Sequence, residues 1–289
     1  MTEGAITSRI IDGGLSTELA AAGHDLTDHL WSARLLRDEP QAIVQAHLAF
    51  LHAGATVSTT ASYQATFDGF ARSGIDRPET EKLLARSVEL AREAGERAGG
   101  GSLVAASIGP YGAMLADGSE YRGNYGLSVA DLVAFHRPRM EVLAAAGPDL
   151  LALETVPDMR EAEAMLIALD GLGVPAWLSY TVAGGTTRAG QPLAEAFGLA
   201  RGVDAIVAVG VNCCAPAEAA AALPIAAQAS GKPLIAYPNS GEEWDATARD
   251  WTGEAGAWIA DAPQWGAQWL GGCCRVTPAD IAMLAAAVR

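Results

Sequence analysis

Short apolar segments alternate with longer helical patterns along the whole chain of 289 residues. Most of these segments are apolar almost throughout, as expected for parallel strands that are buried on both faces of a sheet. Parallel strands that alternate with helices can form only a few architectures. The eight candidate strands are Arg9–Asp12, Thr56–Thr60, Leu103–Ile108, Leu150–Glu154, Ala176–Thr181, Ala205–Asn212, Pro233–Tyr237 and Trp269–Gly272.

Helical patterns with recognisable start signals fill the segments between these strands. The predicted helix Pro78–Ala98 has proline at its entry and glutamates in its first turn. The predicted helix Ser128–Ala146 opens with a serine cap and with Asp131 three residues on, which resembles a capping box. The other predicted helices are Pro40–Ala53, Asp158–Asp170, Pro192–Arg201, Pro216–Ser230, Glu254–Ala260 and a last one that begins at Pro278 with Thr277 as its N-cap.

Eight strands that alternate with helices predict a closed (β/α)8 barrel, also called a TIM barrel. Barrels of this kind are single domains of about 250 residues, so we expect one domain over residues 1–289. An open, doubly wound sheet is the alternative. Such a sheet more often carries a glycine-rich phosphate-binding fingerprint after its first strand, and this sequence has none there.

Composition excludes several classes of function. The chain has 19 basic and 34 acidic residues, for a net charge of −15. Nucleic acid is therefore not an expected partner, because phosphate binding needs clustered Lys and Arg. The sequence has no run of about 18 apolar residues, so we expect no membrane span. The N-terminal segment also lacks the pattern of a secretory signal. We expect a cytoplasmic protein whose partners are small molecules.

Chemically distinctive residues follow nearly every predicted strand. The segments DGGLSTEL, TTASYQ and GPYGAMLADGSEYRGNYG come after the first three strands. The fourth, sixth, seventh and eighth strands end in LET, NCC, PNSGE and GGCC. Active sites of (β/α)8 barrels are built at the C-terminal ends of the strands. The sequence therefore predicts one functional site at that mouth of the barrel.

The four cysteines occur as two adjacent pairs, Cys213-Cys214 and Cys273-Cys274. Disulfides are not expected in a reducing compartment, so the cysteines are either buried apolar residues or metal ligands. The pairs follow the sixth and eighth strands, whose ends face the same mouth. Cys213, Cys273 and Cys274 can meet there around one ion, and three protein ligands with one open position are typical of catalytic zinc. We assign Cys214 to packing, because successive strand residues alternate in direction.

The segments GVNCC and GGCCRVTP, with IIDGGLSTEL before them, resemble those of the homocysteine S-methyltransferases. The similarity continues through STTASYQATFDGF, ALETVPDMREAEA and AYPNSGEEWD, and so covers nearly the whole chain. The segment ADGSEYRGNYG is most similar to the small branch that uses S-methylmethionine or S-adenosylmethionine. The resemblance implies one zinc ion per chain, bound by Cys213, Cys273 and Cys274, and methyl transfer from a sulfonium donor to L-homocysteine, which forms methionine.

Homocysteine has an ammonium group that needs an anionic partner and a carboxylate that needs N–H donors. Glu154, at the end of an apolar strand, is the predicted partner of the ammonium group. Gly13 and Gly14 are predicted to expose backbone N–H groups that bind the carboxylate. Asp12 is expected either to orient that loop or to meet the ammonium group. Two rim amides complete the predicted acceptor site, Asn212 and Asn239.

The predicted donor site lies in the long loop after the third strand. Aromatic faces and a carboxylate attract a sulfonium cation. Each tyrosine of this loop can instead serve only for packing. The candidates are Tyr111, Glu120, Tyr121 and Tyr125. The five histidines show no spacing typical of a metal site, and we interpret them as surface or packing residues: His24, His29, His47, His52 and His136.

Methyl transfer needs a thiolate, and a free thiol with a pKa near about 8.5 is mostly protonated at neutral pH. Zinc deprotonates a thiol that it binds. Three alternatives remain open: betaine or another methyl donor on the same barrel, a zinc-storing or thiol-sensing protein, and a zinc hydrolase. The hydrolase is disfavoured, because three thiolates make zinc a poor Lewis acid. The physiological donor and the oligomeric state, monomer or dimer, are also left open.

Overall fold

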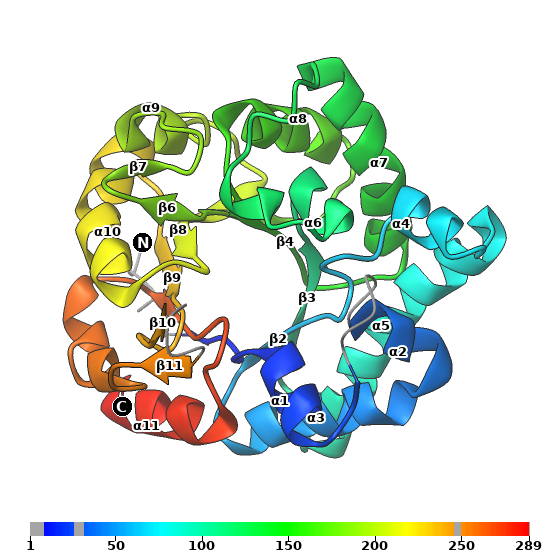
Figure 1. The fold of residues 1–289 in the computed structure, drawn as a ribbon, viewed down its shortest axis with the longest axis horizontal. Coiled ribbons are helices and arrows are strands. Elements are labelled where there is room, and N and C mark those ends of the chain that lie inside the picture. Colours follow the sequence, from blue (N-terminus) through cyan, green and yellow to red (C-terminus); the bar gives the residue numbers. More distant parts are fainter. Residues whose placement is uncertain (1–8, 26–31, 246–249, 289) are drawn as a thin grey trace, which may run out of the picture.

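The computed structural model describes residues 9–25, 32–245 and 250–288. Eight parallel strands form one sheet in the order β1-β12-β9-β8-β5-β4-β3-β2. A parallel bridge between Ile11 and Val57 joins the first strand to the second, and the Thr56 N–H donates to the Ile10 carbonyl at 2.7 Å. The sheet therefore closes on itself, as Figure 1 shows. The strands are β1 (Arg9–Ile10), β2 (Val57–Thr59), β3 (Leu103–Ile108), β4 (Leu150–Val156), β5 (Ala176–Tyr180), β8 (Ile206–Asn212), β9 (Leu234–Tyr237) and β12 (Trp269–Leu270).

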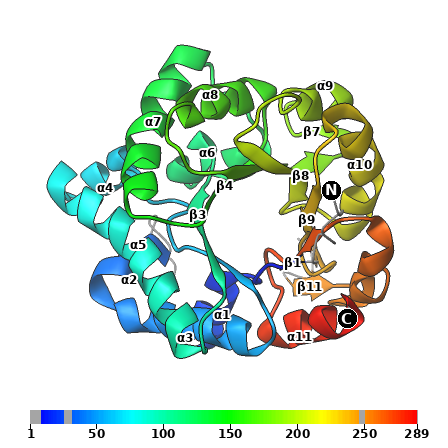
Figure 2. The same ribbon diagram turned by 180° about the vertical axis from the view of Figure 1, so that it is seen from behind.

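Helices surround the sheet on its outer side (Figures 1 and 2). The prediction of a (β/α)8 barrel is thereby confirmed. Among the described residues, no helix has the length and apolarity that crossing a membrane requires. The longer outer helices are α3 (Pro40–His52), α5 (Arg77–Arg97), α7 (Val129–Ala145), α8 (Met159–Leu169), α10 (Pro216–Ser230) and α11 (Pro278–Val288), and α9 (Leu193–Gly198) is a short one.

Alternate strand residues build two separate cores. One set points outward and packs against the helices, and the other set fills the inside of the barrel. Trp177 and Tyr237 belong to the inner set, with ring centroids 6.0 Å apart, and Trp269 packs on Trp177 at 5.8 Å. These large rings fill the interior, so that a ligand can enter only near the strand ends. The inner residues are Ile11, Val57, Ala105, Leu150, Ala152, Trp177, Ala208, Ile235 and Tyr237.

The predicted helix caps are confirmed. The Ser128 hydroxyl accepts from the Asp131 N–H, and the Asp131 carboxylate accepts from the Ser128 N–H. The Thr277 hydroxyl and the Asp280 carboxylate make the same reciprocal pair at the start of α11. Each pair satisfies backbone N–H groups that the helix itself leaves without partners.

One predicted helix is wrong. The segment Glu254–Ala260 contains no α-helix and instead begins the 3-10 turn Ala257–Ala260, followed by a second 3-10 turn, Ala262–Trp265. Gly256 stands at a φ of 72° before the first turn, which interrupts a helix at its start. Pro263 disfavours the helical conformation at the residue before it. The connection between β9 and β12 is therefore the one place in the described barrel where 3-10 turns replace the outer α-helix.

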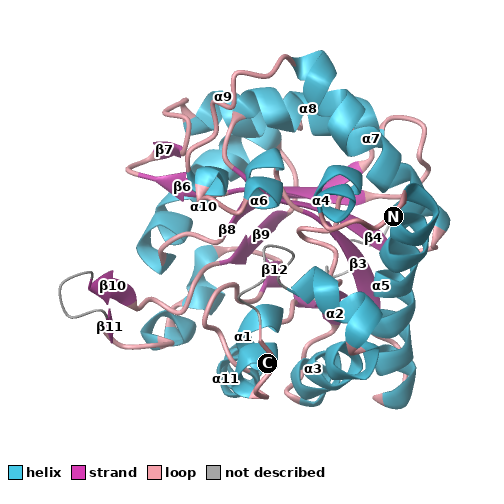
Figure 3. Ribbon diagram, turned by 45° about the vertical axis from the view of Figure 1, so that its right-hand side comes forward, coloured by secondary structure: helices cyan, strands magenta, loops and turns pink. Residues whose placement is uncertain are grey.

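Several elements of the loops were not predicted. The pairs β6 (Val182–Ala183) with β7 (Thr186–Thr187) and β10 (Glu243–Asp245) with β11 (Asp250–Thr252) are short antiparallel hairpins. The second hairpin extends outward from the barrel in Figure 3. Strands β1 and β12 are also shorter than predicted. The additional helices are α1 (Leu15–Ala21), α2 (Ser32–Asp38), α4 (Phe67–Arg72) and α6 (Tyr111–Leu115).

A buried polar network anchors the loop that follows β3. His136 and Arg139 on α7 and Glu161 on α8 are all fully buried. Arg139 donates to the Gly109 carbonyl and to His136 Nδ1, and His136 Nε2 lies 2.9 Å from Glu161 Oε1. The same oxygen accepts from the Tyr111 N–H at 2.6 Å. Because arginine can only donate, His136 is held with its proton on Nε2. The network fixes the start of the loop that carries the predicted donor residues.

We predict that Glu161→Ala destabilises the fold by about 3–5 kcal/mol, because it leaves the Arg139 guanidinium buried without its counter-charge. The free energy of unfolding from urea titration measures this loss. Glu163→Ala is the matched control, since Glu163 lies exposed on the same helix and its loss should change stability by less than about 0.5 kcal/mol. Equal stabilities for the two variants would contradict the anchoring role.

Candidate metal centre and active site

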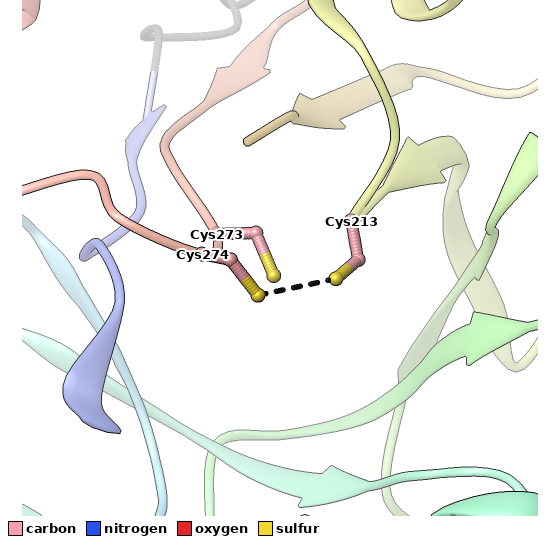
Figure 4. Close-up of side chains that lie close together, drawn as sticks. All are labelled: Cys213, Cys273 and Cys274. Atoms are coloured by element: carbon pink, nitrogen blue, oxygen red, sulfur yellow. Dashed lines mark hydrogen bonds between the residues drawn. The ribbon is translucent and has the colours of Figure 1, made fainter. Parts of the chain in front are cut away.

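Three cysteines from two distant loops meet at the mouth of the barrel. Cys213 directly follows β8, whereas Cys273 and Cys274 lie in the loop after β12. Their sulfur atoms all lie within 4.8 Å of one another, and the Sγ atoms of Cys213 and Cys274 are 3.5 Å apart. Figure 4 shows the three side chains pointing toward a common point. The structure thus brings together the three sulfurs that the sequence predicted.

Backbone geometry directs these side chains. Cys213 has a left-handed φ of 50°, so the chain turns sharply at the end of β8. Its neighbour Cys214 packs in the outer hydrophobic core, as predicted. On the other side, a Cβ atom on Gly271 would lie 2.6 Å from the Ile11 side chain, and one on Gly272 would lie 2.1 Å from Val276. Only glycine fits at these two positions, and the loop of Cys273 can therefore approach the barrel axis closely.

The spacing and electrostatics of the three thiols suit a soft cation. Hydrogen bonds from Cys213 and Cys273 lower the pKa of the Cys274 thiol well below its usual range. A tetrahedral ion with metal–sulfur bonds of about 2.3 Å requires sulfurs about 3.8 Å apart, which is close to the observed spacing. Cys213 is buried and Cys274 is exposed, so one side of the cluster is open to a further ligand.

A cavity of about 140 Å³ lies beside the cysteines. Residues from the ends of most barrel strands contribute to its wall. Those relevant to the predicted site are Gly13, Gly14, Glu120, Tyr121, Glu154, Asn212, Cys213, Cys273 and Cys274.

Glu154 presents a carboxylate that its neighbours hold in place. One oxygen accepts from the Ser107 hydroxyl, and the other accepts from the Tyr237 hydroxyl at 2.9 Å. Tyr237 is itself fixed by the Trp177 Nε1–H, which donates to its oxygen at 2.9 Å. Burial raises the pKa of Glu154 to about 7. The carboxylate is therefore poised to ionise fully when a cation binds beside it.

The other predicted acceptor residues divide into those that line the cavity and those that support it. The Asp12 carboxylate accepts from the N–H and the hydroxyl of Thr59, both at 2.7 Å, and does not reach the cavity wall. Burial raises the pKa of Asp12 to about 8. Thr59 does line the cavity. The two predicted roles of Asp12, orienting the loop of Gly13 and Gly14 or meeting the ammonium group, stay predictions.

The two rim amides also make mainly internal contacts. Asn212 lines the cavity, but its side chain accepts from the Thr155 N–H at 2.7 Å and donates to the Thr155 hydroxyl at 2.8 Å. These bonds hold Thr155 at a left-handed φ of 57°. Asn239 does not line the cavity, and its Oδ1 accepts from the Cys274 N–H at 3.2 Å. It supports the loop that carries the second pair of sulfurs.

Gly13 and Gly14 both line the cavity, at positions with no room for a side chain. A Cβ on Gly13 would lie 2.6 Å from the Val276 carbonyl, and one on Gly14 would lie 2.7 Å from the Cys273 carbonyl. The Gly14 N–H donates to the Val276 carbonyl at 2.9 Å, so it is not free to bind a substrate carboxylate as predicted. The first turn of α1, from Leu15 to Thr17, lines the cavity directly after it.

The predicted donor loop separates into two pairs. Glu120 and Tyr121 line the cavity, and the Tyr121 hydroxyl lies 3.0 Å from Cys213 Sγ. Tyr111 and Tyr125 are not in its wall, because their rings pack on each other at 5.2 Å, and Tyr111 also packs on Phe135 at 4.9 Å. These two tyrosines have the packing role that the sequence left as the alternative.

Sequence reasoning missed several residues of the cavity wall. Ser107 and Tyr237 hold Glu154, and Tyr63 and Gln64 line the cavity after β2. The sequence signal was the segment TTASYQ at a strand end, which contains both of the latter residues. The histidine interpretation holds for His47 and His136, which are fully buried, and for His52, which is exposed. His24 is partly exposed beside Glu39, and His29 lies outside the described residues.

Comparison with known proteins identifies the family. The family model described as Homocysteine S-methyltransferase matches residues 9–288. The chain belongs to the homocysteine S-methyltransferase family. It is 47% identical to the homocysteine S-methyltransferase of Escherichia coli (strain K12), over 96% of this chain and 94% of that protein. It is 41% identical to homocysteine S-methyltransferase YbgG of Bacillus subtilis (strain 168), over 97% of this chain and 94% of the relative.

Solved structures agree with this assignment. The metallated form of the homocysteine methyltransferase MmuM from Escherichia coli superposes with a TM-score of 0.87 and 44% identity, and the match covers 97% of this chain and 96% of that one. The apo form of the same protein gives a TM-score of 0.76. That relative is thus known in a metallated form, and the three sulfurs of the present chain lie close enough together to hold a metal ion.

We predict that Cys273→Ser removes most of the bound metal, because it takes one of three thiolate ligands from the cluster. The number of metal ions per chain is measured by inductively coupled plasma mass spectrometry on the purified protein. Cys214→Ala is the matched control, since Cys214 adjoins a cluster residue but packs in the core, and it should keep full metal content. Full occupancy in the Cys273 variant would refute the ligand assignment.

Proposed function

We propose that this protein transfers a methyl group from a sulfonium donor, S-methylmethionine or S-adenosylmethionine, to the thiolate of L-homocysteine and so forms methionine. The observation that carries the proposal is the convergence of Cys213, Cys273 and Cys274 on a cavity that also contains a buried carboxylate, Glu154. Groups suited to a thiol and to an ammonium group thus line one cavity. Family membership supports the same acceptor.

Zinc is the metal that this donor set fits best, because it favours thiolate ligands in a tetrahedral arrangement with one open position. When bound, it would keep the acceptor thiol deprotonated at neutral pH. The three cysteines would hold one ion per chain. Asn239 would keep the Cys274 backbone in place through its hydrogen bond of 3.2 Å, and the Tyr121 hydroxyl would donate to Cys213 Sγ.

The acceptor's amino-acid end is held by residues of β1 and β4. Glu154 binds the ammonium group, and the hydrogen bonds from Ser107 and Tyr237 keep the carboxylate oriented toward it. The carboxylate of the acceptor lies against Gly13 and the first turn of α1, where backbone N–H groups have no partner within the helix. Asp12 contributes indirectly by orienting Thr59.

The methyl transfer itself needs charge complementarity and alignment. The acceptor sulfur forms a new bond to the methyl carbon, while the bond from that carbon to the donor sulfur breaks and its electron pair stays on the donor sulfur. Glu120 and Tyr121 line the cavity and are the residues proposed to meet the donor. The face of an aromatic ring attracts a sulfonium cation. Charge is neutralised as the methyl group moves, and a cavity that excludes water strengthens the attraction.

A donor screen tests this proposal. With deuterated homocysteine as acceptor, we expect labelled methionine from S-methylmethionine or S-adenosylmethionine, detected by mass spectrometry. The label is needed because S-methylmethionine itself becomes methionine when it loses a methyl group. Betaine and methyl-folate serve as the alternative donors and should give none. The proposed reaction would be refuted if betaine were the sole donor that gave labelled methionine, or if none of the donors gave any.

The pH dependence of homocysteine binding tests the role of Glu154. Its pKa of about 7 in the free protein means that it becomes protonated, and loses its charge, as the pH falls below about 7. Affinity for the ammonium group should then fall by up to about tenfold per pH unit. Glu154→Gln should bind homocysteine at least about tenfold more weakly at pH 8 and should lack this step.

The thiol of homocysteine also releases a proton on binding, so affinity rises with pH in both proteins. The difference between the two calorimetric pH profiles is therefore the quantity that reports on Glu154. Metal content should be equal in the two proteins. Parallel profiles with equal affinities would assign the ammonium group to another residue.

A further inference from the structure

We infer that Gln64 and Glu120 together bind the ammonium group of the methyl donor, not its sulfonium group. This inference rests on the proposed function, because it assumes that two amino acids occupy the cavity at once. It assigns the donor as a sulfonium that carries a 3-amino-3-carboxypropyl chain. S-Methylmethionine and S-adenosylmethionine share that chain, so the subsite serves either one.

Gln64 is a residue of the cavity wall that carries an unpaired hydrogen-bond acceptor. Its side chain lines the cavity after β2 and is only 4% exposed. The amide nitrogen donates to the Ala113 carbonyl on α6 at 2.8 Å. A carbonyl can only accept, so this bond determines which end of the amide is nitrogen. The other end, Oε1, is buried and has no hydrogen-bond partner among the described residues.

Glu120 offers a second acceptor from the neighbouring loop. It lies in the 3-10 turn Ser119–Tyr121, lines the cavity and is also 4% exposed. Its Oε2 atom has no hydrogen-bond partner within the part of the chain that the structure describes. Its backbone packs closely on α6, since a Cβ on Gly112 would lie 2.4 Å from the Glu120 nitrogen. Gln64 and Glu120 are thus anchored on adjacent residues of one short helix, which lies at the rim of the barrel opening in Figure 1.

A buried acceptor without a donor costs about 1–3 kcal/mol, so two of them at one cavity indicate a ligand that supplies donors. An ammonium group has three N–H donors and a positive charge, and it matches an amide oxygen together with a carboxylate. A sulfonium group has no N–H bond. It can meet the Glu120 charge but leaves both oxygens without hydrogen bonds.

The number of carboxylates in the cavity wall supports the same assignment. Of the described residues that line the cavity, two carry a carboxylate, Glu154 on β4 and Glu120 after β3. In-line methyl transfer requires acceptor and donor to be bound together, and each brings one ammonium group. With Glu154 holding the acceptor, Glu120 remains for the donor. The hydroxyl of Tyr121, the next residue in the chain, lies 3.0 Å from Cys213 Sγ, so the subsite adjoins the sulfur cluster that the donor sulfur must approach.

The decisive probe is 4-(dimethylsulfonio)butanoate, which is S-methylmethionine without its amino group. The variants are Glu120→Gln and Gln64→Met, which keep side-chain size but remove the charge or the acceptor. Glu89→Gln, at an exposed glutamate of α5, is the matched control. Binding of both compounds to the metal-loaded protein is measured by calorimetry, and kcat/KM for each donor is measured at saturating homocysteine.

We expect both variants to weaken S-methylmethionine binding and to lower its kcat/KM by about 10- to 100-fold, as for loss of a buried charged hydrogen bond. The amino-free compound should bind weakly to all proteins and change by less than about threefold. Homocysteine affinity and metal content should be unchanged. The control should match the parent protein with both compounds.

Three results would overturn the inference. Equal losses for the two compounds would place Glu120 at the sulfonium group, and a selective loss of homocysteine affinity would place the subsite on the acceptor side. Equal affinity of the parent protein for the two compounds would show that the ammonium group is not recognised. Selective binding of S-methylmethionine without methionine formation would instead refute the proposed reaction and leave this subsite standing.

Discussion

The meeting of three sulfurs from two loops is the constraint on which the rest of the site depends. Cys213 and Cys274 are 61 residues apart in the chain, and their sulfurs come within 3.5 Å because β8 and β12 both end at the same mouth of a closed barrel. Closure rests on short contacts, since β1 and β12 have two residues each. In this arrangement the Cys274 sulfur accepts hydrogen bonds from the other two thiols, and a cation bound by all three sulfurs would replace those hydrogen bonds. The large inner rings below the mouth keep the cluster near the surface, where substrates can reach it.

Burial sets the charges around this cluster. Glu154 and Asp12 both have raised pKa values, about 7 and about 8, because desolvation disfavours their ionised forms. The two carboxylates differ in their surroundings. Asp12 is enclosed, with Thr59 on its oxygens and His47 Nδ1 at 4.0 Å, whereas Glu154 lines the cavity. Burial also lowers the pKa of His47 to about 4, so that residue brings no positive charge. A cationic group bound beside Glu154 would favour the ionised form of its carboxylate.

Much of this arrangement could be predicted from the sequence, because the signals are local or periodic. Apolar runs alternating with capped helices predicted the barrel, and strand-end position predicted the sulfurs and placed Glu154 at the cavity. The failures concern contacts that no short segment encodes. Tyr111 and Tyr125 lie in the right loop, but the buried network of His136, Arg139 and Glu161 fixes that loop so that their rings face each other. A role for Gln64 could not be predicted from the sequence, because it depends on the hydrogen bond by which α6 fixes the amide nitrogen. The segment Glu254–Ala260 was predicted as a helix from its sequence. Gly256 and Pro263 interrupt helical geometry there, and 3-10 turns form instead.

Acceptor and donor in the proposed reaction have nearly the same amino-acid skeleton, so the site must distinguish them by the charge on sulfur. A thiolate can bind a cation held by Cys213, Cys273 and Cys274, whereas a sulfonium group cannot and is attracted instead to aromatic faces. Transfer of the methyl group turns both sulfurs into neutral thioethers and removes both attractions together. The proposed ammonium contacts at Glu154 and Glu120 would then remain as the hold on the two products. Two separate carboxylates allow two amino acids to be bound together, whereas a single shared anion site would admit only one amino acid at a time.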